Sequence, residues 1–160
     1  MKTIVVIPAR FKSSRFPGKP LKKILKREMI FWVAESCAKA VGKKNILVAT
    51  DDKRIFKAVR EKKYNVCMTS KNCVTGTDRV YQASNKIKSD IYINVQGDEP
   101  LVKHSDIVKI INAKKKFRNS IICGYTQISK NENYLNKNIP KVLFNHKKNL
   151  IYISRLPIPG

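Results

Sequence analysis

Cationic and hydroxyl side chains gather in one short loop near the start of the sequence. Residues 8–21 read PARFKSSRFPGKPL and carry Arg10, Ser13, Arg15 and Lys19. Guanidinium and ammonium groups on a proline-stiffened loop are suited to bind phosphate, because their charge is fixed and little chain entropy is lost on binding. The alternative is a solvated loop, and for the lysines alone this is the simpler interpretation.

A second polar cluster, Gln96-Gly97-Asp98-Glu99, directly follows an apolar run over residues 91–95. A carboxylate such as Asp98 on a tight, glycine-led turn suits Mg²⁺, which takes one or two carboxylates together with phosphate oxygens and water. The alternative for an isolated Asp98 is a turn former or a helix cap.

The elements between these clusters alternate between strand and helix. Short apolar runs predict strands over 4–7, 46–49, 66–68 and 91–95, with Pro8 ending the first. Helical spacing predicts helices over 29–41, after Asp51 or Asp52, from Thr77, and after a Ser105 cap. Gly42 is expected to stop the first of these helices, and Val80, Ala83 and Ile87 are expected to face inward from the third. This alternation predicts an α/β fold with a mostly parallel central sheet and flanking helices. A strand over 121–128 and a hairpin of 142–144 with 150–154 are also expected.

In an open α/β sheet, ligands bind beyond the carboxyl ends of the strands. The basic loop, the Thr50-Asp51-Asp52 turn and the Gln96–Glu99 cluster all follow predicted strands, so they are expected at that edge. The sequence contains neither Gly-x-Gly nor Gly-Lys-Ser/Thr, which excludes the dinucleotide fingerprint and the P-loop. Cationic side chains after the first strand and carboxylates after the fourth instead predict a nucleotide site, in which lysine, arginine and a bound metal contact the phosphates.

The composition limits the classes of partner. Lys and Arg number 34 against 11 Asp and Glu, a formal charge of +23, but the lysines lie in scattered pairs and triplets rather than in one basic stripe with aromatics. Such dispersion favours a solvated surface over nucleic acid as a partner. The four cysteines form no C-x-x-C pair, and no apolar run reaches membrane-spanning length. We therefore expect a reduced, cytoplasmic protein without a membrane partner.

Five motifs resemble one family in order and spacing. They are IPARFKSSRFPGKPL at 7–21, ATDD at 49–52, MTS at 68–70, TGTDR at 75–79 and NVQGDEPL at 94–101. Together they resemble the cytidylyltransferases that activate 3-deoxy-manno-octulosonate (Kdo), the CMP-Kdo synthetases. NVQGDEP is the most discriminating, since the related sialic-acid cytidylyltransferases usually carry a different segment there.

The resemblance implies a nucleotide-diphospho-sugar transferase fold, related to glycosyltransferase A domains. It implies transfer of CMP from CTP to the anomeric hydroxyl of Kdo, with release of pyrophosphate, for lipopolysaccharide biosynthesis. Mg²⁺ is the implied cofactor, and CTP and an acid sugar are the implied partners. A homodimer is implied if the C-terminal part of the family's chain is present.

The resemblance also implies roles for residues of this sequence. Arg10, Lys19 and Asp98 are the implied catalytic residues, with Asp98 as the Mg²⁺ ligand, and Gln96 is implied to contact both nucleotide and sugar acid. The implied nucleotide-binding set is Pro8, Ala9, Arg10, Ser13, Arg15, Lys19, Thr69, Ser70, Gly76, Thr77 and Gln96.

The sequence departs from the family pattern in three respects. Cys73 stands where a histidine is common, and Thr75 where serine is commoner. Family members are also longer, so residues 1–160 are expected to form a single nucleotidyltransferase domain that is C-terminally incomplete, and the activity of the shorter chain is left open. Two alternatives stand beside the main hypothesis: CMP activation of a different acid sugar, and a non-catalytic nucleotide- or RNA-binding fragment of the same fold.

Overall fold

The computed structural model describes residues 1–12 and 16–158 of the protein. Its contacts divide the chain into two compact units, Met1–Ile122 and Cys123–Gly160, which are described separately below. The single domain over residues 1–160 stays a prediction. Ser13 and Arg15, two of the predicted phosphate contacts, lie outside the described residues.

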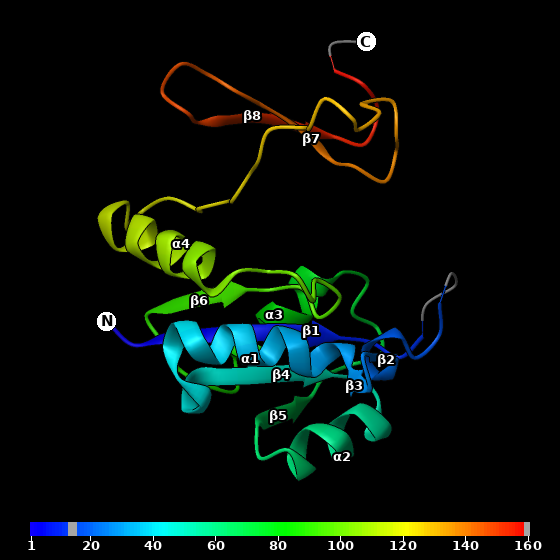
Figure 1. The fold of residues 1–160 in the computed structure, drawn as a ribbon. Coiled ribbons are helices and arrows are strands. Elements are labelled where there is room, and N and C mark those ends of the chain that lie inside the picture. Colours follow the sequence, from blue (N-terminus) through cyan, green and yellow to red (C-terminus); the bar gives the residue numbers. More distant parts are fainter. Residues whose placement is uncertain (13–15, 159–160) are drawn as a thin grey trace. The chain divides into compact units, whose positions relative to one another are not determined.

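The first unit is built on a four-stranded parallel sheet (Figure 1). Its strands are β1 (Thr3–Ala9), β4 (Ile46–Thr50), β5 (Asn65–Met68) and β6 (Ile91–Asn94), in the order β5-β4-β1-β6. Val5, in the middle of β1, is paired with Ile46 on one side and Ile93 on the other. The α/β fold with a mostly parallel sheet is therefore confirmed, and β1 is a central strand.

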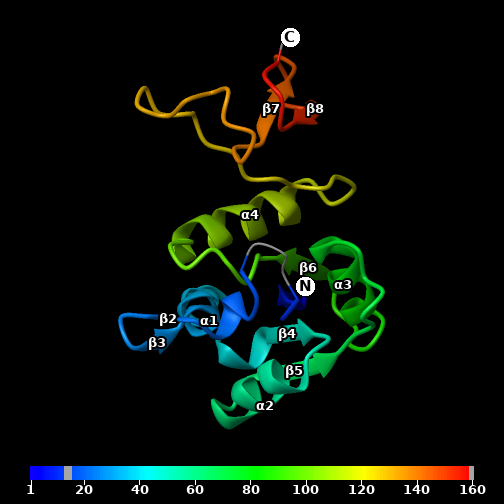
Figure 2. The same cartoon turned by 90° about the vertical axis from the view of Figure 1, so that its right-hand side faces the viewer.

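Helices cover both faces of this sheet (Figure 2). The helices α1 (Met29–Val41), α2 (Lys53–Glu61) and α4 (His104–Lys116) share one apolar cluster with Val5 and Ile7 of β1. Helix α3 (Gly76–Ser84) packs Val80 and Ala83 on the other face, against Ile4 and Val6. Because β1 is buried on both faces, its sequence is continuously apolar rather than alternating.

Helix ends follow the predicted signals in two places. Helix α1 ends at Gly42, whose φ is 80° and whose N–H donates to the carbonyl of Ala38. Helix α2 is capped by Asp52, whose side chain accepts from the N–H of Arg54. Since the Arg54 guanidinium also hydrogen-bonds that carboxylate, the pKa of Asp52 is lowered.

Three local predictions are wrong. Pro8 does not end its strand: β1 continues to Ala9, because β6 pairs with β1 only as far as Val6 and the last residues have one neighbouring strand. Helix α4 begins at His104 rather than after Ser105, with the carbonyl of Lys103 accepting from the first turn. Residues 121–128 form no strand, because no other described segment pairs with them.

A short hairpin before α1 was not predicted. It joins β2 (Lys23–Ile24) to β3 (Arg27–Glu28) through Leu25 and Lys26, whose φ values are 48° and 66°. Two three-residue 3₁₀ helices, η1 (Lys19–Leu21) and η2 (Lys43–Asn45), complete the first unit. A positive φ without glycine leaves no sequence signal for such a turn.

The second unit contains the predicted antiparallel hairpin of β7 (Lys141–Phe144) and β8 (Leu150–Ser154). The rings of Tyr125 and Phe144 lie 4.8 Å apart, and the buried Lys141 ammonium donates to the carbonyls of Asn136 and Arg155. Most apolar side chains of both strands remain exposed. Across the described part of the chain, no helix combines the length and apolar character needed to cross a membrane.

Candidate functional site at the carboxyl edge of the sheet

Three loops converge where β1, β4 and β6 end, as the parallel topology requires. The approach of the β6 loop to the end of β1 is close: a Cβ placed on Gly97 would lie 2.9 Å from the carbonyl oxygen of Pro8 and 3.4 Å from Cγ2 of Ile7. Only glycine fits at that position without displacing the backbone. The Gln96–Glu99 turn is thereby held against the start of the basic loop.

Lys19 and Asp98, 79 residues apart in sequence, are in direct contact. The Lys19 ammonium lies 2.7 Å from the Asp98 carboxylate, with side-chain exposures of 35% and 50%. Lys19 is positioned by Gly18, whose φ is 69° and whose N–H donates to the carbonyl of Phe11, closing the loop before η1 begins. Two residues predicted to be catalytic therefore lie side by side, and both are accessible to a ligand.

Three further predicted residues meet beside this pair. A Cβ placed on Gly76 would lie 2.9 Å from Oε1 of Gln96 and 3.4 Å from Cγ of Pro8. The Gln96 side chain is oriented by its amide, which donates to Oδ1 of Asn94 at 3.0 Å. The end of β1, the start of α3 and the turn after β6 therefore form one wall of the site.

Thr69 and Ser70, which follow β5, are held by a buried arginine of α3. Arg79 is 2% exposed, and its guanidinium donates to the Thr69 hydroxyl, to the Ser70 carbonyl at 3.4 Å and to the Asp51 carboxylate at 2.9 Å. The backbone of Thr69 donates to the carbonyl of Thr50 at 2.8 Å. These bonds attach the segment to the loop after β4 and to α3.

The other described candidates lie around these groups. Ala9 is buried at the last position of β1, and the exposed Arg10 directly follows it. Thr77 is exposed in the first turn of α3, next to Gly76. The described members of the predicted set therefore come from the ends of β1, β5 and β6, from the start of α3 and, for Lys19, from η1.

The donor set fits a metal ion that is shared with a ligand. Asp98 offers a half-exposed carboxylate, and the pKa of its neighbour Glu99 is raised by burial and by the negative charge of Asp98. Within residues 1–12 and 16–158, no group of three or more His, Cys, Asp or Glu side chains is arranged so that it could hold a metal ion. Such a site suits Mg²⁺ held by one carboxylate, water and phosphate oxygens rather than by a protein cage.

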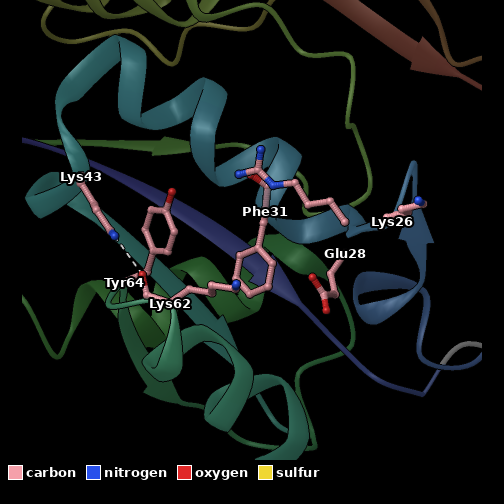
Figure 3. Close-up of a pocket in the computed structure, with 7 residues that line it drawn as sticks. Lys26, Glu28, Phe31, Lys43, Lys62 and Tyr64 are labelled. Carbon is pink, nitrogen blue, oxygen red and sulfur yellow. Dashed lines mark hydrogen bonds between the residues drawn. The ribbon is translucent and has the colours of Figure 1, made fainter.

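A cavity of about 450 Å³ lies elsewhere in the first unit (Figure 3). The ammonium of Lys43 stands 4.4 Å from the centre of the Tyr64 ring and donates to the carbonyl of Lys62. Burial raises the pKa of Tyr64. None of the predicted site residues lines this cavity, which is bounded by Lys26, Arg27, Glu28, Phe31, Lys43, Lys62 and Tyr64.

Comparison with known proteins shows the family to which this chain belongs. The sequence model of a family described as cytidylyltransferase matches residues 4–160. The protein belongs to the cytidylyltransferase family. A solved structure of CMP:2-keto-3-deoxy-manno-octonic acid synthetase complexed with CTP is similar over 100% of this chain and 66% of its own, with a TM-score of 0.86 and 34% sequence identity.

Two curated relatives named 3-deoxy-manno-octulosonate cytidylyltransferase are each 40% identical to this family member. The relative from Thermodesulfovibrio yellowstonii is matched by 99% of this chain over 66% of its own length. The relative from Geobacter metallireducens is matched by 100% of this chain over 63% of its length. The chain thus spans just under two thirds of the curated relatives it matches, and the expected nucleotidyltransferase fold is confirmed.

The residues that hold the Thr69–Ser70 segment were not predicted individually. Asp51 and Arg79 lie within the ATDD and TGTDR motifs, but nothing in the sequence indicates that they pair. Gln82, one helical turn after Arg79, belongs to none of the five motifs. Its side chain nevertheless accepts a hydrogen bond from the N–H of Ser70. Arg79 is buried together with Val80 and Ala83 in α3, which helical periodicity alone does not indicate for a cation.

Proposed function

We propose that this cytidylyltransferase transfers CMP from CTP to the anomeric hydroxyl of 3-deoxy-manno-octulosonate and releases pyrophosphate. The observation that carries the proposal is the contact of Lys19 with Asp98, beside the wall made by Pro8, Gly76 and Gln96. The relatives' names and the CTP complex of the similar structure support the choice of substrates.

In this proposal the protein acts chiefly by orientation and charge. The sugar hydroxyl attacks the α-phosphorus of CTP in line with the leaving pyrophosphate, a reaction that asks for positioning more than for covalent catalysis. Arg10 and Lys19 would bind the triphosphate and stabilise the charge that develops on it. Gln96, fixed by Asn94, would contact both the nucleotide and the sugar acid.

Mg²⁺ is the proposed cofactor, and Asp98 would hold it. When bound, the ion would polarise the phosphate oxygens and neutralise their charge. Asp98 is paired with Lys19 in the structure. If Asp98 held the ion, the Lys19 ammonium would be released from the carboxylate and could bind a phosphate oxygen. The site thereby keeps its charges compensated both before and after binding.

Pyrophosphate release tests the proposal. The chain is incubated with Mg²⁺, CTP and each of a panel of sugar acids that includes Kdo and a sialic acid. Pyrophosphate release that depends on Kdo supports the proposal. Release only with another acid would show that the protein activates a different acid sugar, and it would link the departure at Cys73 to that change of substrate. Binding of CTP without release for any acid overturns the transfer and leaves the non-catalytic alternative.

Two further expectations rest on the same resemblance. We propose that the protein acts in lipopolysaccharide biosynthesis. We also propose that it forms a homodimer if the C-terminal part found in its longer relatives is present. The cytoplasmic location stays a prediction.

A further inference from the structure

We propose that Arg79 and Gln82 of α3 are positioning residues that fix the Thr69–Ser70 segment for the cytosine and ribose half of CTP. The inference rests on the proposed function and on the resemblance described above, which implies that the MTS and TGTDR segments line the cytosine and ribose pocket. It adds two side chains that do not themselves contact the substrate.

Arg79 provides the first anchor. Its guanidinium is almost fully buried and bonds the Thr69 hydroxyl and the Ser70 carbonyl from one side. The opposite charge that permits this burial is Asp51, whose side chain is 15% exposed and lies 2.9 Å away. A buried guanidinium without such a partner is strongly destabilising, so Asp51 is what keeps Arg79 in place.

Gln82 provides the second anchor, one helical turn further on the same side of α3. Its Oε1 accepts from the N–H of Ser70 at 2.7 Å. Both peptide groups that flank the Ser70 side chain are therefore bound by α3, the N–H by Gln82 and the carbonyl by Arg79. The Ser70 hydroxyl in turn accepts from the N–H of Asn72 at 3.0 Å, which sets the orientation of the loop that follows.

Helix α3 is itself rigidly placed. Val80 and Ala83 pack on the sheet, and the first turn is closed by reciprocal bonds between Thr75 and Asp78. A Cβ placed on its first residue, Gly76, would collide with the Gln96 side chain, which therefore lies close to the start of the helix. The same helix therefore fixes the Gln96 wall at its start and the Thr69–Ser70 segment along its side, which is the geometry a preorganised nucleoside pocket needs.

The phosphate half of the site is built differently. Arg10 and Lys19 belong to the loop after β1, and the hydrogen bond and ion pair that Lys19 makes go to Asp98 rather than to Arg79 or Gln82. Weakening the α3 anchors should therefore reduce the affinity for CTP and leave the affinity for inorganic triphosphate unchanged. General destabilisation of the fold would weaken both ligands together.

The test measures the Kd of Mg·CTP and of Mg·triphosphate by calorimetry for wild type, Gln82→Ala, Gln82→Glu and Arg79→Lys. Gln82→Ala removes one hydrogen bond and is expected to weaken CTP binding about tenfold, with triphosphate binding unchanged within about twofold. Gln82→Glu keeps the acceptor and should restore most of the affinity for CTP. Arg79→Lys keeps the charge beside Asp51 but replaces two guanidinium nitrogens, which bond Thr69 and Ser70 on one side and Asp51 on the other, by a single nitrogen, so it should resemble Gln82→Ala.

Tyr81 supplies the matched control, since it lies on α3 between the two anchors and is 68% exposed. Tyr81→Phe is expected to bind both ligands like wild type. Equal loss for both ligands, or unchanged CTP binding in Gln82→Ala, would overturn the inference. A wild-type protein that does not prefer CTP to triphosphate would instead overturn the proposed function, so the two failures are distinguishable.

Discussion

The Lys19–Asp98 ion pair contributes little to the stability of the fold. Both side chains are one third to one half exposed, and ion pairs of this kind contribute about 0–1 kcal/mol to the free energy of unfolding. Any large effect of changing either residue must therefore arise in the chemistry that the pair supports. This separation makes both residues good probes of the proposed mechanism.

Substituting Asp98 tests the metal assignment. Asp98→Asn should change the free energy of unfolding by less than about 1 kcal/mol. It should remove nearly all Mg²⁺-dependent turnover, because an amide is a poor ligand for Mg²⁺ in a site with so few carboxylates. Chemical denaturation and pyrophosphate release measure the two effects. A variant with near-normal turnover would show that Asp98 does not hold the metal.

Lys19 and Lys12 form a natural comparison within the same loop. Lys19→Ala removes a preorganised cation at the phosphates and should cost about 3 kcal/mol, roughly a hundredfold or more in rate. Lys12 is exposed and makes no ion pair among the described residues, so Lys12→Ala should change the rate little. Steady-state kinetics of the two variants provide the measurement. Equal small losses would mean that the loop is merely solvated.

Among the helices and strands, the sequence correctly predicts the features that depend on neighbouring residues alone. Apolar β-branched runs correctly placed β1, β4 and β6, and Gly42 and Asp52 correctly marked helix ends. The failures involve partners that local sequence does not specify. The run over 121–128 has strand composition without a strand to pair with, and Pro8 extends β1 because β6 stops short.

The sequence predicted that the site lies at the carboxyl edge of the sheet, but it did not predict the hydrogen bonds and ion pairs that hold the site together. Strand alternation alone placed the loops after β1 and β6 at one edge, and the structure brings Lys19 to Asp98 there. The burial of Arg79 and its pairing with Asp51 depend on how α3 is rotated against the sheet, a tertiary property. Helical periodicity identified Val80 and Ala83 as inward-facing, but it does not indicate that a neighbouring cation is buried too.

The reciprocal cap at the start of α3 is a testable stability element. The Thr75 hydroxyl accepts from the N–H of Asp78 at 3.1 Å, and the Asp78 carboxylate accepts from the N–H of Thr75 at 2.7 Å. Thr75→Ala should lower the free energy of unfolding by about 1 kcal/mol. Thr75→Ser keeps the hydroxyl and serves as the control in urea denaturation. An unchanged midpoint for Thr75→Ala would contradict the role of the cap.

The same cap predicts a pH dependence. Hydrogen bonds from the backbone of Thr75 lower the pKa of Asp78 in the folded protein. The carboxylate therefore stabilises the fold above its unfolded pKa of about 4, and this contribution is lost as the pH falls through the lowered folded pKa. The stability difference between wild type and Asp78→Asn should be present at pH 7 and shrink below pH ~4. A difference that does not vary with pH would contradict this account.

For the whole molecule, the formal charge of +23 must be separated from specific recognition. Attraction to scattered lysines follows the salt concentration and ignores the base, whereas the proposed site should prefer CTP to ATP and require Mg²⁺. Titrating both nucleotides at two salt concentrations measures the preference. Tight, base-indifferent RNA binding without preference for CTP would favour the non-catalytic RNA-binding alternative.

The central position of β1 has a consequence for how the protein is made. The strand leaves the ribosome before its second neighbour, β6, which comes from residues 91–94, and the backbone of Lys2 bonds the chain at Asp90 and Ile91. At ~5–20 residues per second, synthesis from the end of β4 to the start of β6 takes roughly 2 to 8 s. During that interval one side of a strand with a continuously apolar sequence lacks its partner, so the nascent chain is expected to need protection from aggregation.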